Sequence, residues 1–158
     1  MILSSVGYAF LSNPGKDAPV TPHETGSGGV QNQGNGVWTA SVYGATFQFF
    51  TDPTQIGNIS VMTNGTFADL VASPINYDTQ SPGLGQALQE TVGQVVLIQP
   101  VCVGPCTQNV PEKECSSRIV LWNQTASENR VYSDRQCIVI EGGRAAFDAW
   151  MYHLTGLA

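Results

Sequence analysis

Cysteine is the residue type in this chain best suited to chemistry, since its thiolate binds metals, attacks electrophiles and forms disulfides. A structural zinc site usually combines close Cys-x-x-Cys pairs with further cysteines or histidines. The four cysteines show no Cys-x-x-Cys pair and no histidine nearby; they are Cys102, Cys106, Cys115 and Cys137. This spacing predicts no metal site and favours disulfides or buried thiols.

The two histidines lack the neighbours that catalysis requires. His23 follows Pro22 in a loop, and His153 falls in an apolar stretch where its ring is expected to pack against other side chains. The chain contains no Gly-x-Ser-x-Gly nucleophile motif, and the segment 83–88 lacks the third glycine of a dinucleotide-binding loop. We therefore expect no catalytic residues, no cofactor and no enzymatic activity.

Three sequons bear on the compartment in which the chain folds. They begin at Asn58, Asn64 and Asn123. Secretion would predict glycans at these positions together with one or two disulfides, whereas assembly in the cytosol would predict unmodified asparagines and free thiols. The sequons alone leave both compartments open.

The surface is expected to be polar but mostly uncharged. Charged residues make up 11 % of the chain, and the formal net charge is −6 with only six Lys and Arg. So few cations argue against nucleic acid and anionic membranes as partners, and no apolar run approaches the roughly 18 residues of a membrane span. We predict one domain over residues 1–158, with an exposed glycine-rich loop at 25–36 and a charged C-terminal part at 112–158.

The elements that must position these residues are predicted to be strands. Apolar or alternating runs, punctuated mostly by Gly, Pro, Asn or Asp, cover residues 2–11, 37–50, 56–62, 67–75, 94–103, 118–122, 130–132, 137–141 and 145–154. An Asn-Gly pair at Asn64 predicts a two-residue hairpin turn, and residues 82–91 form the one expected helix. The predicted fold class is all-β: a compact β-barrel or sandwich of short antiparallel strands with long loops and at most one short helix.

Several segments, in the same order, resemble the protruding domain of calicivirus major capsid proteins of the lagovirus or norovirus kind. The C-terminal segment 141–154 is similar to the glycine turn and aromatic strand that end that domain, with Phe147 and Trp150 as the matching aromatics. The segments 40–47, 55–65, 74–78 and 118–132 are similar to its earlier strands and turns. The resemblance covers residues 37–158.

This resemblance implies a viral capsid spike domain that mediates attachment to host cells. Members of the family form homodimeric spikes on the virion surface, are assembled in the host cytoplasm, and bind cell-surface glycans of the histo-blood group type or another receptor. Neutralising antibodies are a further expected partner. The alternative interpretation is a secreted β-rich adhesin or pilus-type subunit, for which disulfides and occupied sequons would argue.

Two sets of residues are predicted to carry this function. Neutral hydrogen-bonding groups and an occasional carboxylate in outer loops would bind the glycan; the candidates are Thr63, Asn64, Asp69, Ser133 and Asp134. Large aromatic residues would form the core or the dimer interface; the candidates are Tyr43, Trp122, Phe147 and Trp150.

Overall fold

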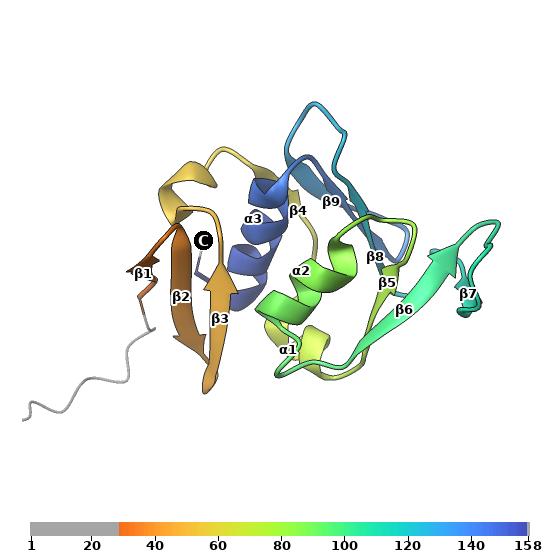
Figure 1. Ribbon diagram of the computed structural model, residues 1–158, viewed down its shortest axis with the longest axis horizontal. Coiled ribbons are helices and arrows are strands. Elements are labelled where there is room, and N and C mark those ends of the chain that lie inside the picture. Colours follow the sequence, from red (N-terminus) through yellow and green to blue (C-terminus); the bar gives the residue numbers. More distant parts are fainter. Residues whose placement is uncertain (1–28, 158) are drawn as a thin grey trace, which may run out of the picture.

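The structure is a computed structural model that describes residues 29–157. It places two β-sheets on either side of a layer of helices (Figure 1). The smaller sheet is an antiparallel meander of three strands: β1 (Gln31–Gly34), β2 (Val37–Val42) and β3 (Ala45–Phe49).

Tight turns connect these three strands. Asn35 and Gly36 lie between β1 and β2, Tyr43 and Gly44 lie between β2 and β3, and all four residues have a positive φ. Positive φ at both central residues is typical of the type I′ turn, which matches the twist of a hairpin. An Asn-Gly hairpin turn therefore forms at Asn35, in the segment predicted to be a loop. The first part of that segment, residues 25–28, lies outside the described residues.

The larger sheet has seven strands of mixed direction. In spatial order they are β4 (Ser60–Met62), β9 (Arg130–Asp134), β10 (Cys137–Glu141), β8 (Ile119–Asn123), β5 (Ile75–Asp78), β6 (Ile98–Val103) and β7 (Glu112–Lys113). Strands β10, β8, β5, β6 and β7 run parallel to one another, whereas β9 and β4 run in the opposite direction. Strand β10 lies between β8 and β9 and runs parallel to β8, so this sheet cannot be an antiparallel meander.

The helices fill the space between the sheets. They are α1 (Phe67–Val71), α2 (Leu84–Thr91) and α3 (Arg144–Thr155), with a short 3-10 helix, η1 (Pro53–Gln55). Helix α2 contacts β3 on one side and β5 and β6 on the other, and α3 contacts β4, β9 and β10. Tyr152 of α3 stacks on Phe49 of β3 with ring centroids 3.9 Å apart. Within residues 29–157, no helix combines the length and apolarity needed to cross a membrane.

Helix α3 is the centre of the core. Nine of its 12 residues are buried, including Phe147, Trp150, Met151 and Tyr152. A helix that is covered on both sides needs no polar face, so its sequence is apolar almost all round. It ends at Gly156, which has a φ of 71° and closes the last turn as a left-handed C-cap.

The predicted all-β fold is wrong. Residues 144–155 form α3 and not a closing strand, residues 67–75 divide between α1 and the start of β5, and the main sheet is mixed and largely parallel. The physical reason is that a short run buried on all sides has the same hydrophobic pattern in a helix as in a strand. The helix predicted at 82–91 is confirmed as α2.

The hairpin predicted at Asn64 is also wrong. The chain leaves β4 and enters α1, whose N-cap is Thr66. The Thr66 hydroxyl accepts a hydrogen bond from the Asp69 N–H, and the Asp69 carboxylate accepts one from the Thr66 N–H at 2.9 Å. This capping box satisfies two backbone donors at the helix start, and the hydrogen bonds from Thr66 lower the pKa of Asp69 below its ordinary value.

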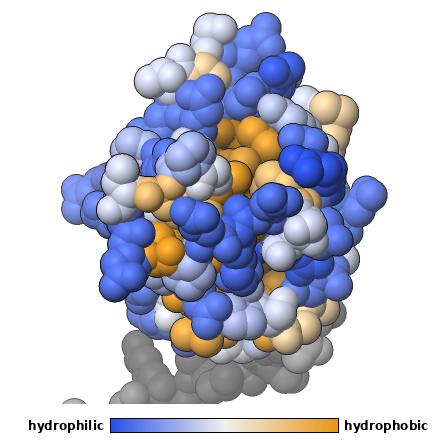
Figure 2. Space-filling view, turned by 90° about the vertical axis from the view of Figure 1, so that its right-hand side faces the viewer, coloured by the Kyte–Doolittle hydropathy of each residue, from blue (hydrophilic) through white to orange (hydrophobic). Residues whose placement is uncertain are grey.

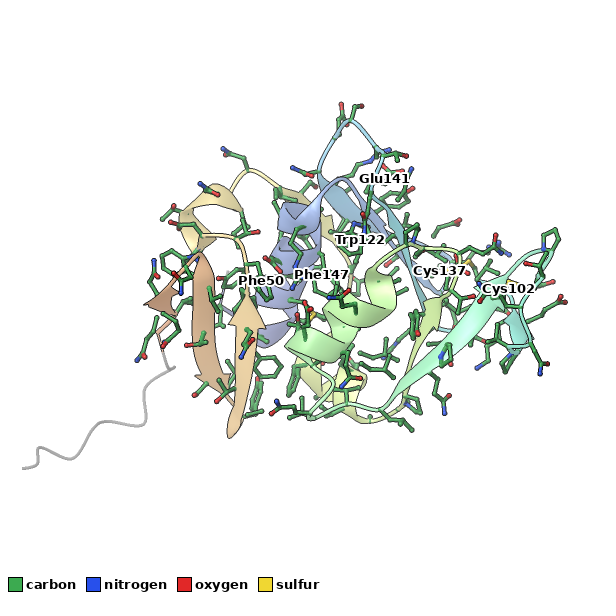
Figure 3. All side chains as sticks on the ribbon, in the orientation of Figure 1. Phe50, Cys102, Trp122, Cys137, Glu141 and Phe147 are labelled. Atoms are coloured by element: carbon green, nitrogen blue, oxygen red, sulfur yellow. A yellow bond between two sulfur atoms is a disulfide. The ribbon has the colours of Figure 1, made fainter. Side chains whose placement is uncertain are left out.

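An ion pair with a buried carboxylate joins the start of α3 to the smaller sheet. Asp148 is fully buried, and its carboxylate accepts hydrogen bonds from Arg144 Nε at 3.0 Å and from the Phe50 N–H at 2.9 Å. The Arg144 guanidinium lies over the Phe50 ring at 4.4 Å and over the Phe147 ring at 4.9 Å. Figure 3 labels these two phenylalanines. It also donates to the Thr91 hydroxyl of α2 at 3.2 Å. The end of the smaller sheet and the helices α2 and α3 meet at this cluster.

All four cysteines are paired in two disulfides. Cys115 is joined to Cys137 at the start of β10, and Cys102 of β6 is joined to Cys106 in the following loop. Cys115 and Cys137 belong to a second, smaller apolar cluster with Val101 and Ile119. This cluster lies on the face of the large sheet that is opposite the helices.

Candidate functional site

The face of the large sheet that points away from the helices carries a row of apolar side chains across four strands. The strand register aligns Met62 of β4 with Tyr132 of β9, Tyr132 with Val139 of β10, and Val139 with Leu121 of β8. The residues next to them in each strand point the other way; Val131, Ile138, Ile140, Val120 and Trp122 are buried in the main core. We call Met62, Tyr132, Val139 and Leu121 the outer row.

The outer row is only partly covered. Met62 is 63 % exposed, and Tyr132, Val139 and Leu121 are half-buried. The small cluster around Cys115 and Cys137 shields Val139 and Leu121 from one side. Figure 2 views the molecule from the right-hand side of Figure 1, where β6 and β7 lie, and shows apolar residues between hydrophilic ones on that side. Contiguous apolar surface with a polar rim is typical of an interaction site.

A row of polar residues borders the outer row. The register aligns Ser60 with Arg130, Arg130 with Glu141, and Glu141 with Asn123. Arg130 Nε donates a hydrogen bond to Glu141 Oε2, and the Tyr132 hydroxyl donates to Glu141 Oε1 at 3.2 Å. The Arg130 guanidinium also lies 5.3 Å from the centre of the Tyr132 ring. These contacts fix Tyr132 in place beside Met62.

The charges in this cluster influence one another. The hydrogen bond from Arg130 lowers the pKa of Glu141 below its ordinary value of 4.5, and the same pairing raises the pKa of Arg130. Burial, followed by the negative charge of Glu141, raises the pKa of the Tyr132 hydroxyl. Glu141 is therefore ionised and Tyr132 neutral at neutral pH, which makes the phenol a hydrogen-bond donor to the carboxylate.

We expect the Glu141 carboxyl to titrate below 4.5 in the folded protein. A group whose pKa is lowered by folding stabilises the folded state above its unfolded pKa, and that contribution is lost as the pH falls through the folded pKa. The side-chain carbon shift of Glu141, followed by NMR between pH 7 and 2.5, measures it directly. In Arg130→Gln the midpoint should rise toward 4.5, with a smaller rise in Tyr132→Phe. A midpoint at or above 4.5 in the unmodified chain would contradict the arrangement.

A shallow hollow lies beside the outer row. It has a volume of about 550 Å³ and is lined by Met62, Arg130, Tyr132 and Ser133. An aromatic ring, a flexible thioether and a guanidinium at one surface are the side chains that protein interfaces favour. The hollow is wide and open, so it suits a protruding side chain better than an enclosed small molecule.

The structure brings some of the predicted glycan-binding residues together. Met62 and Tyr132 are paired in neighbouring parallel strands, so Thr63 and Asn64, which follow β4, lie at the end of the sheet where Ser133 and Asp134 end β9. Ser133 lines the hollow and is exposed, whereas Thr63 is buried. Asp69 does not join this group, because its carboxylate caps α1.

The predicted core or interface aromatics occupy different places. Phe147 and Trp150 are fully buried in α3, and Trp122 is 6 % exposed, with its Nε1 donating to the Gly142 carbonyl at 2.8 Å. Tyr43 lies outside the core: it is 77 % exposed in the β2–β3 turn and stacks on Phe67 at 5.3 Å. His153 lies exposed in the last turn of α3, and His23 lies outside the described residues.

Sequence reasoning missed the outer row. Its four residues come from four strands, and only the register of β4, β9, β10 and β8 aligns them. The available signal was the alternation within 130–134 and 137–141, where each strand presents residues to two different faces. That pattern shows that a second face exists but not which strands are neighbours.

Across residues 29–157, no three His, Cys, Asp or Glu side chains lie close enough together to hold a metal ion.

Comparison with known proteins assigns this chain to no family. The chain matches no protein-family model, no curated protein and no solved structure.

Proposed function

We propose that this chain is an extracytoplasmic attachment or assembly domain whose copies associate with one another through the outer row. The observation that carries the proposal is the alignment of Met62, Tyr132, Val139 and Leu121 on the helix-free face, with Met62 63 % exposed. Met62 lies at the end of the edge strand β4, and exposing so large an apolar side chain beside the apolar residues of β9, β10 and β8 is unfavourable unless another surface covers it.

The pairing of all four cysteines supports the extracytoplasmic location. Disulfides form and persist mainly in oxidising compartments, and they are rare in the cytosol. The pairing of Cys115 with Cys137 joins the start of β10 to the segment before β8, inside an apolar cluster. It therefore favours a secreted adhesin or pilus-type subunit over a capsid spike assembled in the host cytoplasm. The predicted all-β barrel is wrong, whereas the viral attachment role stays a prediction.

The charges next to the outer row favour a second copy as the partner. Arg130 and Asp134 lie two residues to either side of Tyr132 on the same strand and point to the same face. Two copies that face each other with antiparallel β9 strands would place Arg130 of one copy opposite Asp134 of the other. The Tyr132 and Met62 side chains would then meet in the middle, in a symmetric contact.

The dimensions of the outer row predict a weak contact. Four strands span about 14 Å at the usual strand spacing, and a patch of that width covers about 200 Å², far below the ~800 Å² per partner that a stable dimer buries. A weak contact is sufficient where many copies are displayed together, because multivalency raises the overall affinity. This requirement fits a subunit of an assembly better than an isolated dimer.

We expect Met62→Asp to abolish self-association. An unpaired carboxylate at the centre of the contact would have to be desolvated when two copies meet, and this costs more than the contact gains. Sedimentation velocity of the full chain from 10 µM to 1 mM measures the effect; the unmodified protein should show a concentration-dependent increase in mass and the variant should remain monomeric.

Leu97→Asp is the matched control. Leu97 is 64 % exposed, as Met62 is 63 % exposed, but it precedes β6 and lies outside the outer row. It should associate like the unmodified chain. If the unmodified chain stays monomeric at 1 mM, or if both variants behave alike, the outer row is not a contact between copies.

A further inference from the structure

The two disulfides differ in their access to solvent. Cys106 is partly exposed, and it follows the exposed residues Gly104 and Pro105 in the loop after β6. Cys115 and Cys137 are 6 % and 0 % exposed inside an apolar cluster. Thiol–disulfide exchange requires a thiolate to reach one sulfur along the S–S axis, so only the Cys102–Cys106 pair presents a sulfur that can be attacked.

A hydrogen-bond donor lies next to the other sulfur of this exposed pair. Gln80 Nε2 is 3.1 Å from Cys102 Sγ, and the same amide donates to the Val103 carbonyl at 3.1 Å. Cys102 itself is 1 % exposed. A donor held at this distance stabilises the negative charge that develops on Cys102 when the S–S bond breaks, which makes Cys102 the better leaving group.

The ring that this disulfide closes is short. Its cysteines are four residues apart, whereas Cys115 and Cys137 are 22 residues apart. In the chain-entropy description, breaking either disulfide lowers the folding equilibrium constant. The factor by which it falls is roughly ten times smaller for the shorter ring than for the longer one. The backbone also holds the loop independently, since the Cys102 N–H donates to the Pro111 carbonyl at 3.0 Å. The domain can therefore stay folded with Cys102 and Cys106 reduced.

We propose that Cys102–Cys106 is a thiol–disulfide exchange site that reacts with a dithiol, while Cys115–Cys137 is a permanent structural bond. One thiolate of the dithiol attacks Cys106 Sγ, the S–S bond breaks, and Cys102 leaves with the electron pair as a thiolate beside Gln80. The second thiolate of the dithiol then attacks the reagent's own sulfur in the mixed disulfide and releases Cys106. The two cysteines gain two electrons and two protons, and the dithiol is oxidised to a disulfide.

An open hollow lies next to this site and gives room for the dithiol. It has a volume of about 610 Å³ and is lined in part by Gly104 and Pro105, which lie between the two cysteines, and by Lys113 of β7. Lys113 pairs with Val103 across β6 and β7, but its Nζ donates to Asn76 Oδ1 at 3.1 Å, and Glu112 and Glu114 also line the hollow. The hollow therefore supplies space for the dithiol and no net positive charge.

Limited reduction of the full chain tests this inference. The oxidised protein is treated with dithiothreitol under native conditions, samples are alkylated at intervals, and peptide mass spectrometry reports which cysteines are labelled. Cys102 and Cys106 should be labelled at least about ten-fold faster than Cys115 and Cys137. Equal rates, or faster labelling of Cys115 and Cys137, would overturn the assignment.

The variant Gln80→Leu tests whether the Gln80 amide raises the rate of reduction beyond the effect of the solvent exposure of Cys106. Gln80→Leu should slow reduction of the Cys102–Cys106 bond by about three-fold while Cys115 and Cys137 stay protected. Gln99→Leu, at an exposed glutamine of β6, should react like the unmodified chain. An unchanged rate in Gln80→Leu would show that Gln80 does not assist the leaving sulfur. None of these results depends on self-association, so they test this site independently of the outer row.

Discussion

Replacing Asp148 with alanine is expected to lower the free energy of unfolding by about 1–3 kcal/mol, because it removes a fully buried hydrogen-bonded carboxylate, although Arg144 is 27 % exposed and keeps its salt bridge to Glu90. Asp148 is fully buried and accepts hydrogen bonds from both Arg144 and the Phe50 N–H. The substitution therefore breaks the ion pair and also leaves a backbone donor unsatisfied at the end of β3. Chemical denaturation followed by circular dichroism measures the loss.

Two comparisons make the Asp148 result specific. Asp134→Ala removes an exposed carboxylate and should change the free energy of unfolding by less than about 0.5 kcal/mol. In a double-mutant cycle, Arg144→Ala combined with Asp148→Ala should cost less than the sum of the two single losses, with a coupling of about 1–3 kcal/mol. Additive losses, or an Asp148→Ala loss below 1 kcal/mol, would mean that this ion pair does not join α3 to the smaller sheet.

Phe147→Ala is expected to lower the free energy of unfolding by about 3–5 kcal/mol. The Phe147 ring is fully buried and lies between Trp122 at 5.4 Å and Trp150 at 5.9 Å. Truncation removes both aromatic contacts and the surface on which Arg144 rests, and it opens a cavity between the large sheet and α3. The surrounding β-strands and helix cannot close this cavity without moving several packed side chains.

Phe50→Ala is the comparison for Phe147. Phe50 also lies against Arg144, but it is 41 % exposed, so its truncation should cost only about 1 kcal/mol. Thermal unfolding of the two variants side by side gives the ranking. Similar losses for Phe50→Ala and Phe147→Ala would contradict the placement of Phe147 at the centre of the core.

Local signals in the sequence predict part of this fold correctly. The amphipathic pattern of residues 82–91 predicts α2, and short apolar runs predict most of the strands of the large sheet. The predicted strand at 67–75 overlooked the Thr66-x-x-Asp69 pattern, a capping-box signal that marks the start of α1 and outweighs the turn preference of the adjacent Asn64 and Gly65. The sequence carries both the capping-box signal and the Asn-Gly turn signal. The burial of Phe67 and Leu70 in the core favours the helix over the hairpin.

The remaining features depend on contacts between distant segments. Helix α3 is buried on both sides, so Phe147 and Trp150 follow no one-sided periodicity that would mark a helix. Four cysteines allow three pairings, and the sequence alone does not choose among them. The outer row can be predicted only when the neighbours of β9 are known. The strand order is what places Met62 on one side of Tyr132 and Val139 on the other.

The most direct test of the outer row is an amide NMR titration of the full chain by its own concentration, from 20 µM to 1 mM. We predict that concentration-dependent shifts are confined to β4, β9, β10 and β8, are largest at Met62 and Tyr132, and are absent from Leu97 and α2. They should disappear in Met62→Asp. Spectra that do not change with concentration, or shifts centred on another surface, would contradict the proposal that this face joins copies of the chain.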